Sequence, residues 1–423
     1  MAMSRPGVYR DTWFWNAGLA SYWFASTFKW SILLASIIPG QVKAIVPAGT
    51  ENSSWGQVFA IGALWAIIGP ALFGHLSDRL GRRKPFIAAG CALTVMGLAI
   101  MADASTLGML IVGYLLLQIS DDVGTGPYGG VIPAVVPEDR RGFASSVMSQ
   151  LQLSAQILSA VTGLILKDPR FVYLAVGLVN VTCAVITLTV MRPIKETKPA
   201  PPTVAAPRES FAEGWVKPWK SPDFRWVWIT RFLAVAGLTL ILNYLRFYFE
   251  ATYNQDAQGR LFMFGQPKFT GNESVMVVIL FIAVFGAIGA VLSARRIDKW
   301  GRKRVVRGAA LIVIGCLAAF AVVRDIGHAL LFAPIFGIGY GSYLAAEWAM
   351  AIDVAPDPET LGKDMGLWSS SQPTAQFLVG NVGWVIDAAN RARPDSGYMA
   401  MIAIAIICFL IGRHCVGQIQ GSS

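Results

Sequence analysis

The chain has 423 residues, of which 55% are hydrophobic and only 14% are charged. A soluble protein carries about 25% charged residues, and this composition therefore excludes an ordinary soluble enzyme or binding domain. The formal net charge of +10 indicates a nucleic-acid partner only if the basic residues form a surface, so their placement along the chain decides that question.

Apolar runs long enough to cross a bilayer, about 17–25 residues, recur from end to end. They predict an all-α membrane protein with twelve transmembrane helices. The helices are expected near residues 14–40, 55–76, 86–103, 107–136, 143–166, 171–191, 225–250, 273–294, 305–323, 328–355, 364–388 and 397–413.

The basic residues gather at alternate ends of these helices, at 79–84, 140–141, 192–225 and 295–307. Cytoplasmic loops of membrane proteins carry such an excess of Lys and Arg. We therefore place both termini in the cytoplasm and the protein in the cell (plasma or inner) membrane. The positive charge reports topology and does not indicate a nucleic-acid partner.

One long hydrophilic stretch, residues 192–223, divides the expected helices six and six. It is rich in proline and charge, which is typical of a linker between domains. The sequence thus predicts an N-terminal six-helix half over 1–191, a cytoplasmic linker over 192–223 and a C-terminal six-helix half over 224–423.

The two halves share a repeated loop. LSDRLGRRK (76–84) follows the second expected helix, and RIDKWGRKR (296–304) follows the eighth, 220 positions later. A looser match at the same spacing joins VIPAVVPEDRRG (131–142) to AIDVAPDPETLG (351–362). Parallel repeats of this kind are typical of transporters whose two halves rock about a central site.

The segment GHLSDRLGRRK (74–84) resembles the loop between helices 2 and 3 of the major facilitator superfamily, and the six-plus-six layout extends the resemblance over nearly the whole chain. The resemblance implies a gating latch that stabilises the outward-facing state. Its expected residues are Gly74, Asp78, Arg79, Gly81 and Arg82, with Asp298, Gly301 and Arg302 in the second copy. The alternative is that these basic residues only set topology.

Three stretches resemble the branch of glycoside–pentoside–hexuronide carriers and sucrose symporters. They are FKWSILLASIIPGQV, YGGVIPAVVPEDRRGFASSVM and DVAPDPETLGKDMGLW. This resemblance implies a sugar or a glycoside as the small-molecule substrate.

Two adjacent acids, Asp121 and Asp122, fall near the middle of the expected fourth helix. A charge at this depth costs at least about 2.5–3.5 kcal/mol and normally faces a partner or a wet cavity. Adjacent helical residues point about 100° apart, so only one of the acids is expected to face the centre. The resemblance puts helices 1, 4, 7 and 10 around the cavity, where Lys29 of the first helix would meet one acid.

We therefore expect proton-coupling residues at Asp121, Asp122, Lys29 and Glu347. A carboxylate whose proton affinity changes as a cavity dries can carry the coupled proton. The alternative is a static ion pair that fixes helix packing. Arg231, two turns inside the seventh helix, is expected to extend toward the cytoplasm along its aliphatic stem.

Further polar side chains recur at helical spacing and suit a polyol, which offers hydroxyl groups and an apolar ring face. The expected substrate-binding residues are Gln118, Tyr128, Gln152, Gln156, Asn243, Arg246, Tyr340, Tyr343, Gln372 and Gln376. Hydrogen bonds between helices are an equally good explanation of each of them. Arg246 with Glu250 is either an outer-gate pair or a solvated i, i+4 pair.

These observations predict a secondary active transporter that couples sugar or glycoside symport to protons by alternating access. The alternative is a proton-coupled efflux antiporter for drugs or metabolites. Such antiporters carry Gly-Pro-x-x-Gly-Gly on helix 5, whereas GPYGG (126–130) is one residue shorter and lies on helix 4, which favours symport. A membrane enzyme or a receptor has no supporting motif. We expect no cofactor, no metal site and a monomer in the lipid bilayer.

Overall fold

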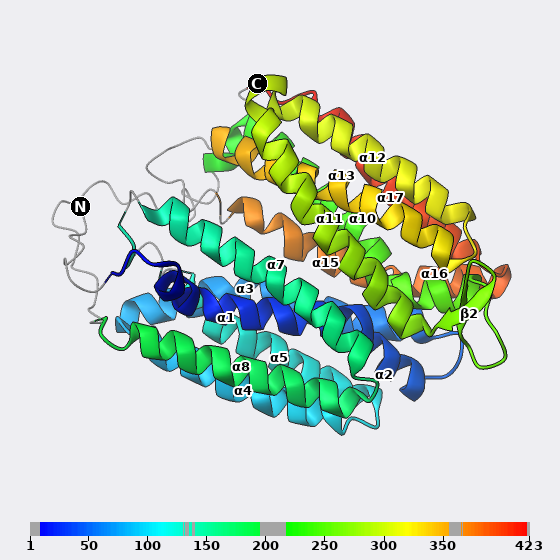
Figure 1. The fold of residues 1–423 in the computed structure, drawn as a ribbon, viewed down its shortest axis with the longest axis horizontal. Helices are drawn as coiled ribbons and strands as arrows, with labels where there is room; N and C mark the ends of the chain where they lie inside the picture. The colour runs from blue at the N-terminus through cyan, green and yellow to red at the C-terminus, as the bar shows by residue number, and fades with distance from the viewer. Residues whose placement is uncertain are drawn as a thin grey trace. The chain divides into compact units, whose positions relative to one another are not determined.

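The computed structural model describes residues 9–129, 131, 135–137, 140–194, 217–354, 365 and 367–420 (Figure 1). Within these ranges the chain is almost entirely helical, and its only sheet is a short hairpin of β1 (Leu261–Met263) and β2 (Gln266–Phe269). Most of the predicted linker, residues 195–216, lies outside the described residues.

The chain forms two compact units. Unit 1 comprises Met1–Ile45 and Ile61–Thr203, and unit 2 comprises Val46–Ala60 and Val204–Ser423. The segment Val46–Ala60, which the sequence repeat assigns to the N-terminal half, thus groups with unit 2. Helix α3 (Glu51–Leu80) begins in unit 2 and ends in unit 1.

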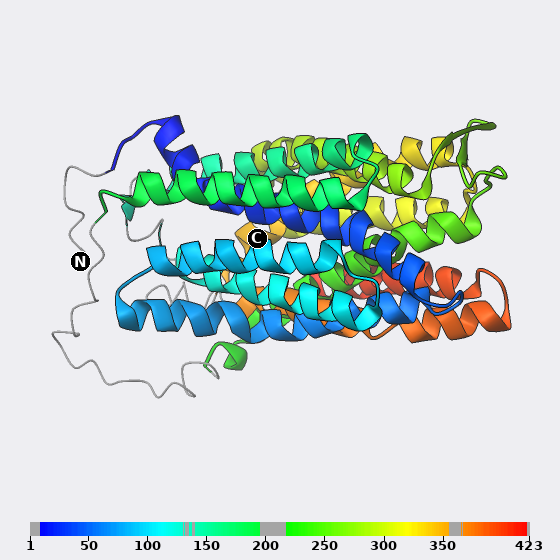
Figure 2. The same cartoon turned by 90° about the horizontal axis from the view of Figure 1, so that it is seen from below.

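Unit 1 is a bundle in which α1 packs against both α7 and α8, and α4 packs against α5 (Figure 2). Its further elements are α1 (Trp13–Ile32), the π-helical segment η1 (Leu33–Ile37), α2 (Ile38–Ile45), α4 (Lys84–Ala102), α5 (Leu107–Tyr128), α7 (Arg141–Ile165) and α8 (Pro169–Met191). Thr12 and Thr106 cap α1 and α5, because each side chain accepts a backbone N–H that the first turn leaves unpaired.

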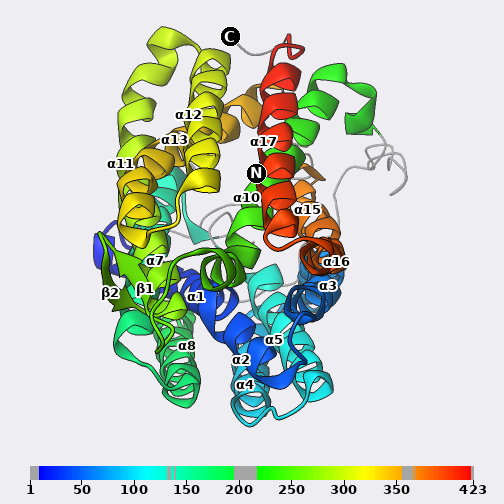
Figure 3. The same ribbon diagram turned by 90° about the vertical axis from the view of Figure 1, so that its right-hand side faces the viewer.

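Unit 2 is built around α10, which packs against α17 and α15, while α12 lies between α13 and α17 (Figure 3). Its elements are the 3-10 turn η3 (Lys217–Lys220), α10 (Pro222–Thr252), α11 (Gly271–Trp300), α12 (Arg302–Val322), α13 (Ile326–Asp353), α15 (Ser371–Gly380), α16 (Gly383–Ala392) and α17 (Ser396–Val416).

Nine helices in the described ranges are long and apolar enough to cross a membrane, and they confirm the expected all-α membrane class. Of the three remaining expected spans, the first contains η1, and the fifth, α7, carries five serines and three glutamines. The eleventh was expected as one helix over 364–388. That part of the prediction is wrong, because the helix is interrupted between Gly380, where α15 ends, and Gly383, where α16 begins. At the break, the Asn381 amide donates to the Phe377 carbonyl at 2.8 Å and competes with the helical hydrogen bonds.

The first turns of α3 are held by groups of unit 2. Asp387 of α16 is 3% exposed, and its carboxylate accepts the Asn52 amide at 2.8 Å and the Ser53 backbone N–H at 2.7 Å. The Trp55 indole N–H donates to the Asn243 carbonyl of α10 at 2.9 Å. Gly56 makes the approach possible, since a Cβ there would lie 2.9 Å from the Tyr244 hydroxyl. These contacts explain why Val46–Ala60 groups with unit 2.

The hairpin between α10 and α11 turns at Phe264 and Gly265, whose φ angles are 51° and 80°. Asp325, in the loop before α13, accepts the backbone N–H of Phe264 at 3.0 Å and of Gly265 at 3.2 Å. Partial burial alone would raise the pKa of Asp325, but these bonds and a third from the Gly327 N–H favour the ionised form and lower its pKa below the ordinary value. Asp325 therefore fastens the turn, as a carboxylate, to the loop between α12 and α13.

Candidate functional site

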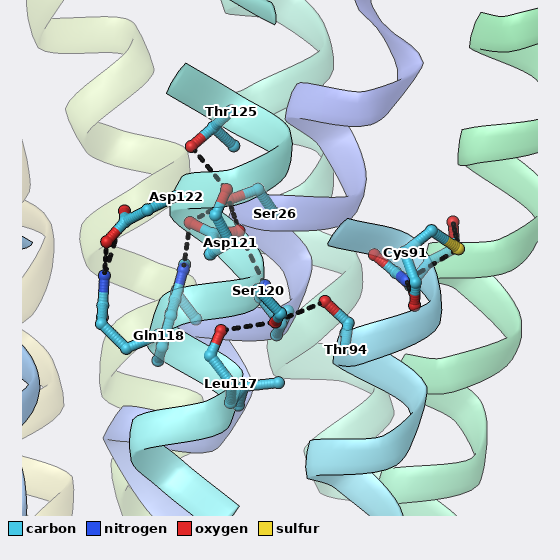
Figure 4. Close-up of polar contacts among 12 residues, drawn as sticks. Ser26, Cys91, Thr94, Leu117, Gln118, Ser120, Asp121, Asp122 and Thr125 are labelled. Atoms are coloured by element: carbon cyan, nitrogen blue, oxygen red, sulfur yellow. Dashed lines mark hydrogen bonds and ion pairs between the residues drawn. The ribbon is translucent and has the colours of Figure 1, made fainter. Parts of the chain in front are cut away.

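Asp121 of α5 is held by three donors from α1, of which Ser26 is labelled in Figure 4. Its carboxylate accepts Lys29 Nζ at 2.7 Å, Ser26 Oγ at 2.9 Å and Trp30 Nε1 at 2.9 Å. Lys29 is 1% exposed, and its ammonium lies 5.0 Å from the centre of the Trp30 ring. Asp121 is therefore the acid that faces α1, and the expected meeting of Lys29 with one of the two acids is present.

Asp122 points away from that pair, as Figure 4 shows. It is 3% exposed, and its two oxygens each lie 3.3 Å from the Gln118 amide nitrogen. No basic side chain within the described residues pairs with it. The α3 backbone approaches closely here, because a Cβ on Gly69 would lie 2.8 Å from the Asp122 carboxyl carbon and 2.8 Å from Trp65 Nε1. That Trp65 N–H is buried and has no hydrogen-bond partner in the described part of the chain.

A second buried ion pair lies in unit 2. Arg231 Nη1 of α10 is 3.2 Å from Glu347 Oε2 of α13, and Arg231 Nη2 donates to the Gln372 side-chain oxygen at 3.3 Å. The guanidinium also lies 3.9 Å from the centre of the Trp368 ring. Glu347 is fully buried, and its other oxygen lies 3.4 Å from the Tyr343 hydroxyl. The expected extension of Arg231 to the cytoplasm is wrong, because its charge is paired inside unit 2.

The two ion pairs join corresponding pairs of helices in the repeat, although Arg231 and Glu347 lie 202 and 226 positions after Lys29 and Asp121 and not at the repeat spacing of 220. In unit 1 the cation comes from the first helix and the acid from the fourth, and in unit 2 they come from the seventh and the tenth. The sequence offered one signal for the second pair, which is that Arg231 and Glu347 repeat the order of Lys29 and Asp121 between corresponding helices.

Three of the expected substrate residues are half-buried amides, Gln152 and Gln156 on α7 and Gln376 on α15. No side-chain hydrogen bond joins any of these amides to a described residue. Other expected residues have intramolecular contacts. Tyr128 donates to the Leu19 carbonyl, Tyr340 stacks on Phe336, Arg246 pairs with Glu250 at 2.9 Å, and the Asn243 carbonyl accepts from Trp55. Their role in substrate binding stays a prediction.

The glycines of the two repeated loops both have a positive φ. Gly81 has a φ of 64° and Gly301 a φ of 80°, a region that favours glycine, which explains why both copies keep it. Gly74 sits close to α5, since a Cβ there would lie 3.5 Å from the Gly126 carbonyl oxygen. Arg79 is exposed, and the Arg82 backbone N–H donates to the Ser77 carbonyl at 3.2 Å.

In the second copy, Arg302 pairs with Asp353 at the end of α13. The side chains of Asp78 and Asp298 lie outside the described residues. The latch itself therefore stays a prediction.

Comparisons with known proteins agree on the class of the molecule. The tetracycline resistance protein, class C, of Escherichia coli is 24% identical over 68% of this chain and 69% of its own length. The sucrose transport protein SUT2 of Oryza sativa subsp. indica is 29% identical over 32% of each chain. A crystal structure of a mutant of the nucleoside transporter NupG superposes with a TM-score of 0.76 at 14% identity, over 96% of this chain and 99% of that one.

The family profile of the Major Facilitator Superfamily matches residues 13–380, which is most of the chain. With the all-α fold and the apolar helices, this match makes the protein a multi-pass membrane transporter and not an enzyme. The chain belongs to the major facilitator superfamily.

Proposed function

We propose that the protein is a proton-coupled symporter of a neutral, hydroxyl-rich solute of the sugar or glycoside class, working by alternating access. The observation that carries this proposal is Asp122, a buried carboxylate beside an acid that is already ion-paired. Among the described residues, the only side chain that hydrogen-bonds to Asp122 is the Gln118 amide.

The division of roles between the two acids follows from their neighbours. A proton added to Asp121 would leave the buried Lys29 ammonium without its counter-charge, which is strongly unfavourable. A proton added to Asp122 would leave no cation of the described residues without its counter-charge. We therefore assign the transported proton to Asp122 and assign Lys29 and Asp121 to keeping α1 against α5. Glu347 and Arg231 form the corresponding ion pair in unit 2, where protonation of Glu347 would likewise leave a buried cation unpaired. Glu347 therefore ranks behind Asp122 as a candidate for coupling.

The amides of α7 support a neutral polar substrate. Gln152 and Gln156 lie one turn apart and are half-buried. Polar groups at membrane depth need a partner or a water-filled cavity. Amide groups offer both donors and acceptors without charge, as a polyol requires.

Efflux of a drug by proton antiport is the second candidate. It is favoured by the tetracycline resistance proteins of Escherichia coli, to which the chain is similar over more than two thirds of its length. The two candidates differ in the direction in which protons move with the substrate.

Proteoliposomes with a pH-sensitive dye outside separate the candidates. Under the proposal, adding sucrose or another glycoside to wild-type protein makes the outside medium more alkaline, because protons enter with the solute. Asp122→Asn should stop accumulation of radiolabelled solute against a gradient, while exchange of solute across the membrane continues.

The matched control is Asp103→Asn, the same chemical change on an exposed residue at the end of α4. It should accumulate solute as the wild type does. Acidification of the medium, with tetracycline as the moving solute, would establish antiport instead. Normal accumulation by Asp122→Asn would remove Asp122 from the coupling step and direct attention to Glu347.

A further inference from the structure

A hollow of about 360 Å³ opens between the start of α12 and the end of α17 in unit 2. It is lined by Lys303, Arg304 and Arg307 on α12, by Arg413 on α17, and by Gly308 and Leu311. By the distribution of basic residues, this is the end of the unit that we place at the cytoplasm. Among the described residues, the lining of this hollow has four cations and no acid, and topology alone does not require such a feature.

The electrostatics of this hollow are unbalanced. The N-terminus of a helix carries a partial positive charge and favours acids, yet α12 has no acid in its first turn and no side-chain cap at Gly301. No carboxylate of the described residues pairs with any of the four basic side chains. The Arg413 Nε is buried and has no hydrogen-bond partner within the described ranges. An anion bound here would interact favourably with the N-terminus of α12, balance the four basic side chains and accept a hydrogen bond from Arg413 Nε.

The surroundings indicate which anion fits. Leu311 lines the hollow and is 48% exposed, and Ile407 and Ile411 of α17 are 51% and 47% exposed. In a helix that spans a membrane, such apolar side chains face acyl chains. A phosphate with acyl chains attached could place its charge among the four cations and its chains along this apolar surface.

We propose that this hollow binds the phosphate of an anionic phospholipid of the cytoplasmic leaflet. Free inorganic phosphate has the same charged group, but it has no acyl chains to cover the apolar surface formed by Leu311, Ile407 and Ile411. The proposal is independent of the transported solute, since none of the lining residues belongs to the coupling or substrate-binding sets.

Native mass spectrometry of the purified full chain in detergent tests the proposal with phosphatidylglycerol as the probe. We expect phosphatidylglycerol to be retained where phosphatidylcholine is not, and to raise the apparent melting temperature. Arg307→Gln and Lys303→Gln should each weaken retention about fivefold, the effect of one basic residue near a membrane surface. Arg225→Gln removes an exposed charge at the start of α10, outside the hollow, and should change nothing.

A second pair of variants tests the shape of the site with every charge kept. A Cβ on Gly308 would meet nothing within 4 Å, so Gly308→Leu directs a side chain into the hollow and should abolish retention. Gly315, on the same helix but outside the hollow, has equally open space, and Gly315→Leu is the matched control that should retain lipid.

The proposal fails if phosphatidylglycerol and phosphatidylcholine are retained equally, or if Gly308→Leu retains lipid as Gly315→Leu does. In that case the basic residues serve topology alone. Equal stabilisation by inorganic phosphate at the same concentration would assign the hollow to a free anion and overturn the lipid proposal.

Discussion

Asp121 and Asp122 lie in the same turn of α5 but in different electrostatic environments. Consecutive helical residues point about 100° apart, so one carboxylate reaches Lys29 on α1 while the other reaches Gln118 and the α3 backbone. Replacing both in the same way is therefore expected to have unequal effects on stability.

Asp121→Asn should destabilise the protein, because it leaves the buried Lys29 ammonium without a counter-charge. Breaking a buried pair in this way costs about 3–5 kcal/mol. The double variant Lys29→Met/Asp121→Asn should recover most of the loss, and Asp122→Asn should cost much less than Asp121→Asn. Thermal unfolding followed by tryptophan fluorescence measures the wild type, these three variants and Lys29→Met alone. Losses in the double variant that equal the sum of the two single losses would refute the coupling of the pair.

The pairing of Lys29 with one of the two acids could be predicted from the sequence, because charges near mid-membrane on facing helices need each other. The pairing of Arg231 could not be predicted in the same way. Arg231 lies nine residues after Pro222, about 13.5 Å along α10 at 1.5 Å per residue, which a long side chain can span toward water. The extension toward water is excluded only by the packing of the unit, which brings Glu347 of α13 to within 3.2 Å of the Arg231 guanidinium.

At the scale of elements, α3 depends on a cap supplied by a distant part of the chain. Asp387 accepts the Ser53 N–H, one of the donors that the first turn of a helix leaves unpaired. The sequence could not predict this contact, because the two residues are more than 300 positions apart and neither lies in a repeated motif.

Asp387→Ala should lower stability by about 1–3 kcal/mol, the cost of leaving buried donors unpaired. Asp387→Asn should fall between the alanine variant and the wild type, because it keeps one acceptor oxygen. Hydrogen exchange over residues 51–60, followed by mass spectrometry, should rise in the same order. Asp103→Ala, an exposed acid at the end of α4, is the control, and an equal rise in both alanine variants would contradict the cap.

The hairpin predicts a dependence on pH through Asp325. Its pKa is lower in the folded protein than in the unfolded chain, where it is about 3.9. The bonds to Phe264 and Gly265 therefore contribute stability above that pH and are lost as pH falls through the folded-state value. A spin label on Gln266→Cys should gain mobility below about pH 4.

Asp325→Ala should make that label mobile at neutral pH as well. A label on Ser105→Cys, in the exposed loop between α4 and α5, reports on general unfolding. If both labels loosen together in the acid range, the hairpin is not fastened by Asp325.

At the scale of the whole molecule, the all-α membrane class could be predicted from composition and period, because each span needs its own apolar stretch. The break between α15 and α16 and the grouping of residues 46–60 with unit 2 could not. The break follows from a local side-chain bond of Asn381. The grouping depends on glycines that let distant backbones approach, as Gly380 does where a Cβ would lie 2.8 Å from the Ala60 side chain. The sequence shows where a glycine is, but it does not show which distant backbone packs against that glycine.

The predicted topology remains to be tested on intact cells. A membrane-impermeant maleimide should label Gln258→Cys, in the loop opposite the basic ends, before lysis. It should label Ser210→Cys, in the linker, only after lysis, because the linker is expected in the cytoplasm. The unsubstituted chain with its five cysteines gives the background. Labelling of Ser210→Cys from outside would reverse the map.

The membership of α3 in both units has a mechanical consequence. A continuous rod that begins in one unit and ends in the other transmits any displacement between them, unless it bends or one end is released. Pro70 removes one backbone hydrogen bond from the rod and is the natural place for bending. The bonds at Asn52, Ser53 and Trp55 resist release, and each added kcal/mol in them would slow that step about fivefold. If transport requires the two units to move against each other, we therefore expect the strength of this anchorage to affect the rate of turnover.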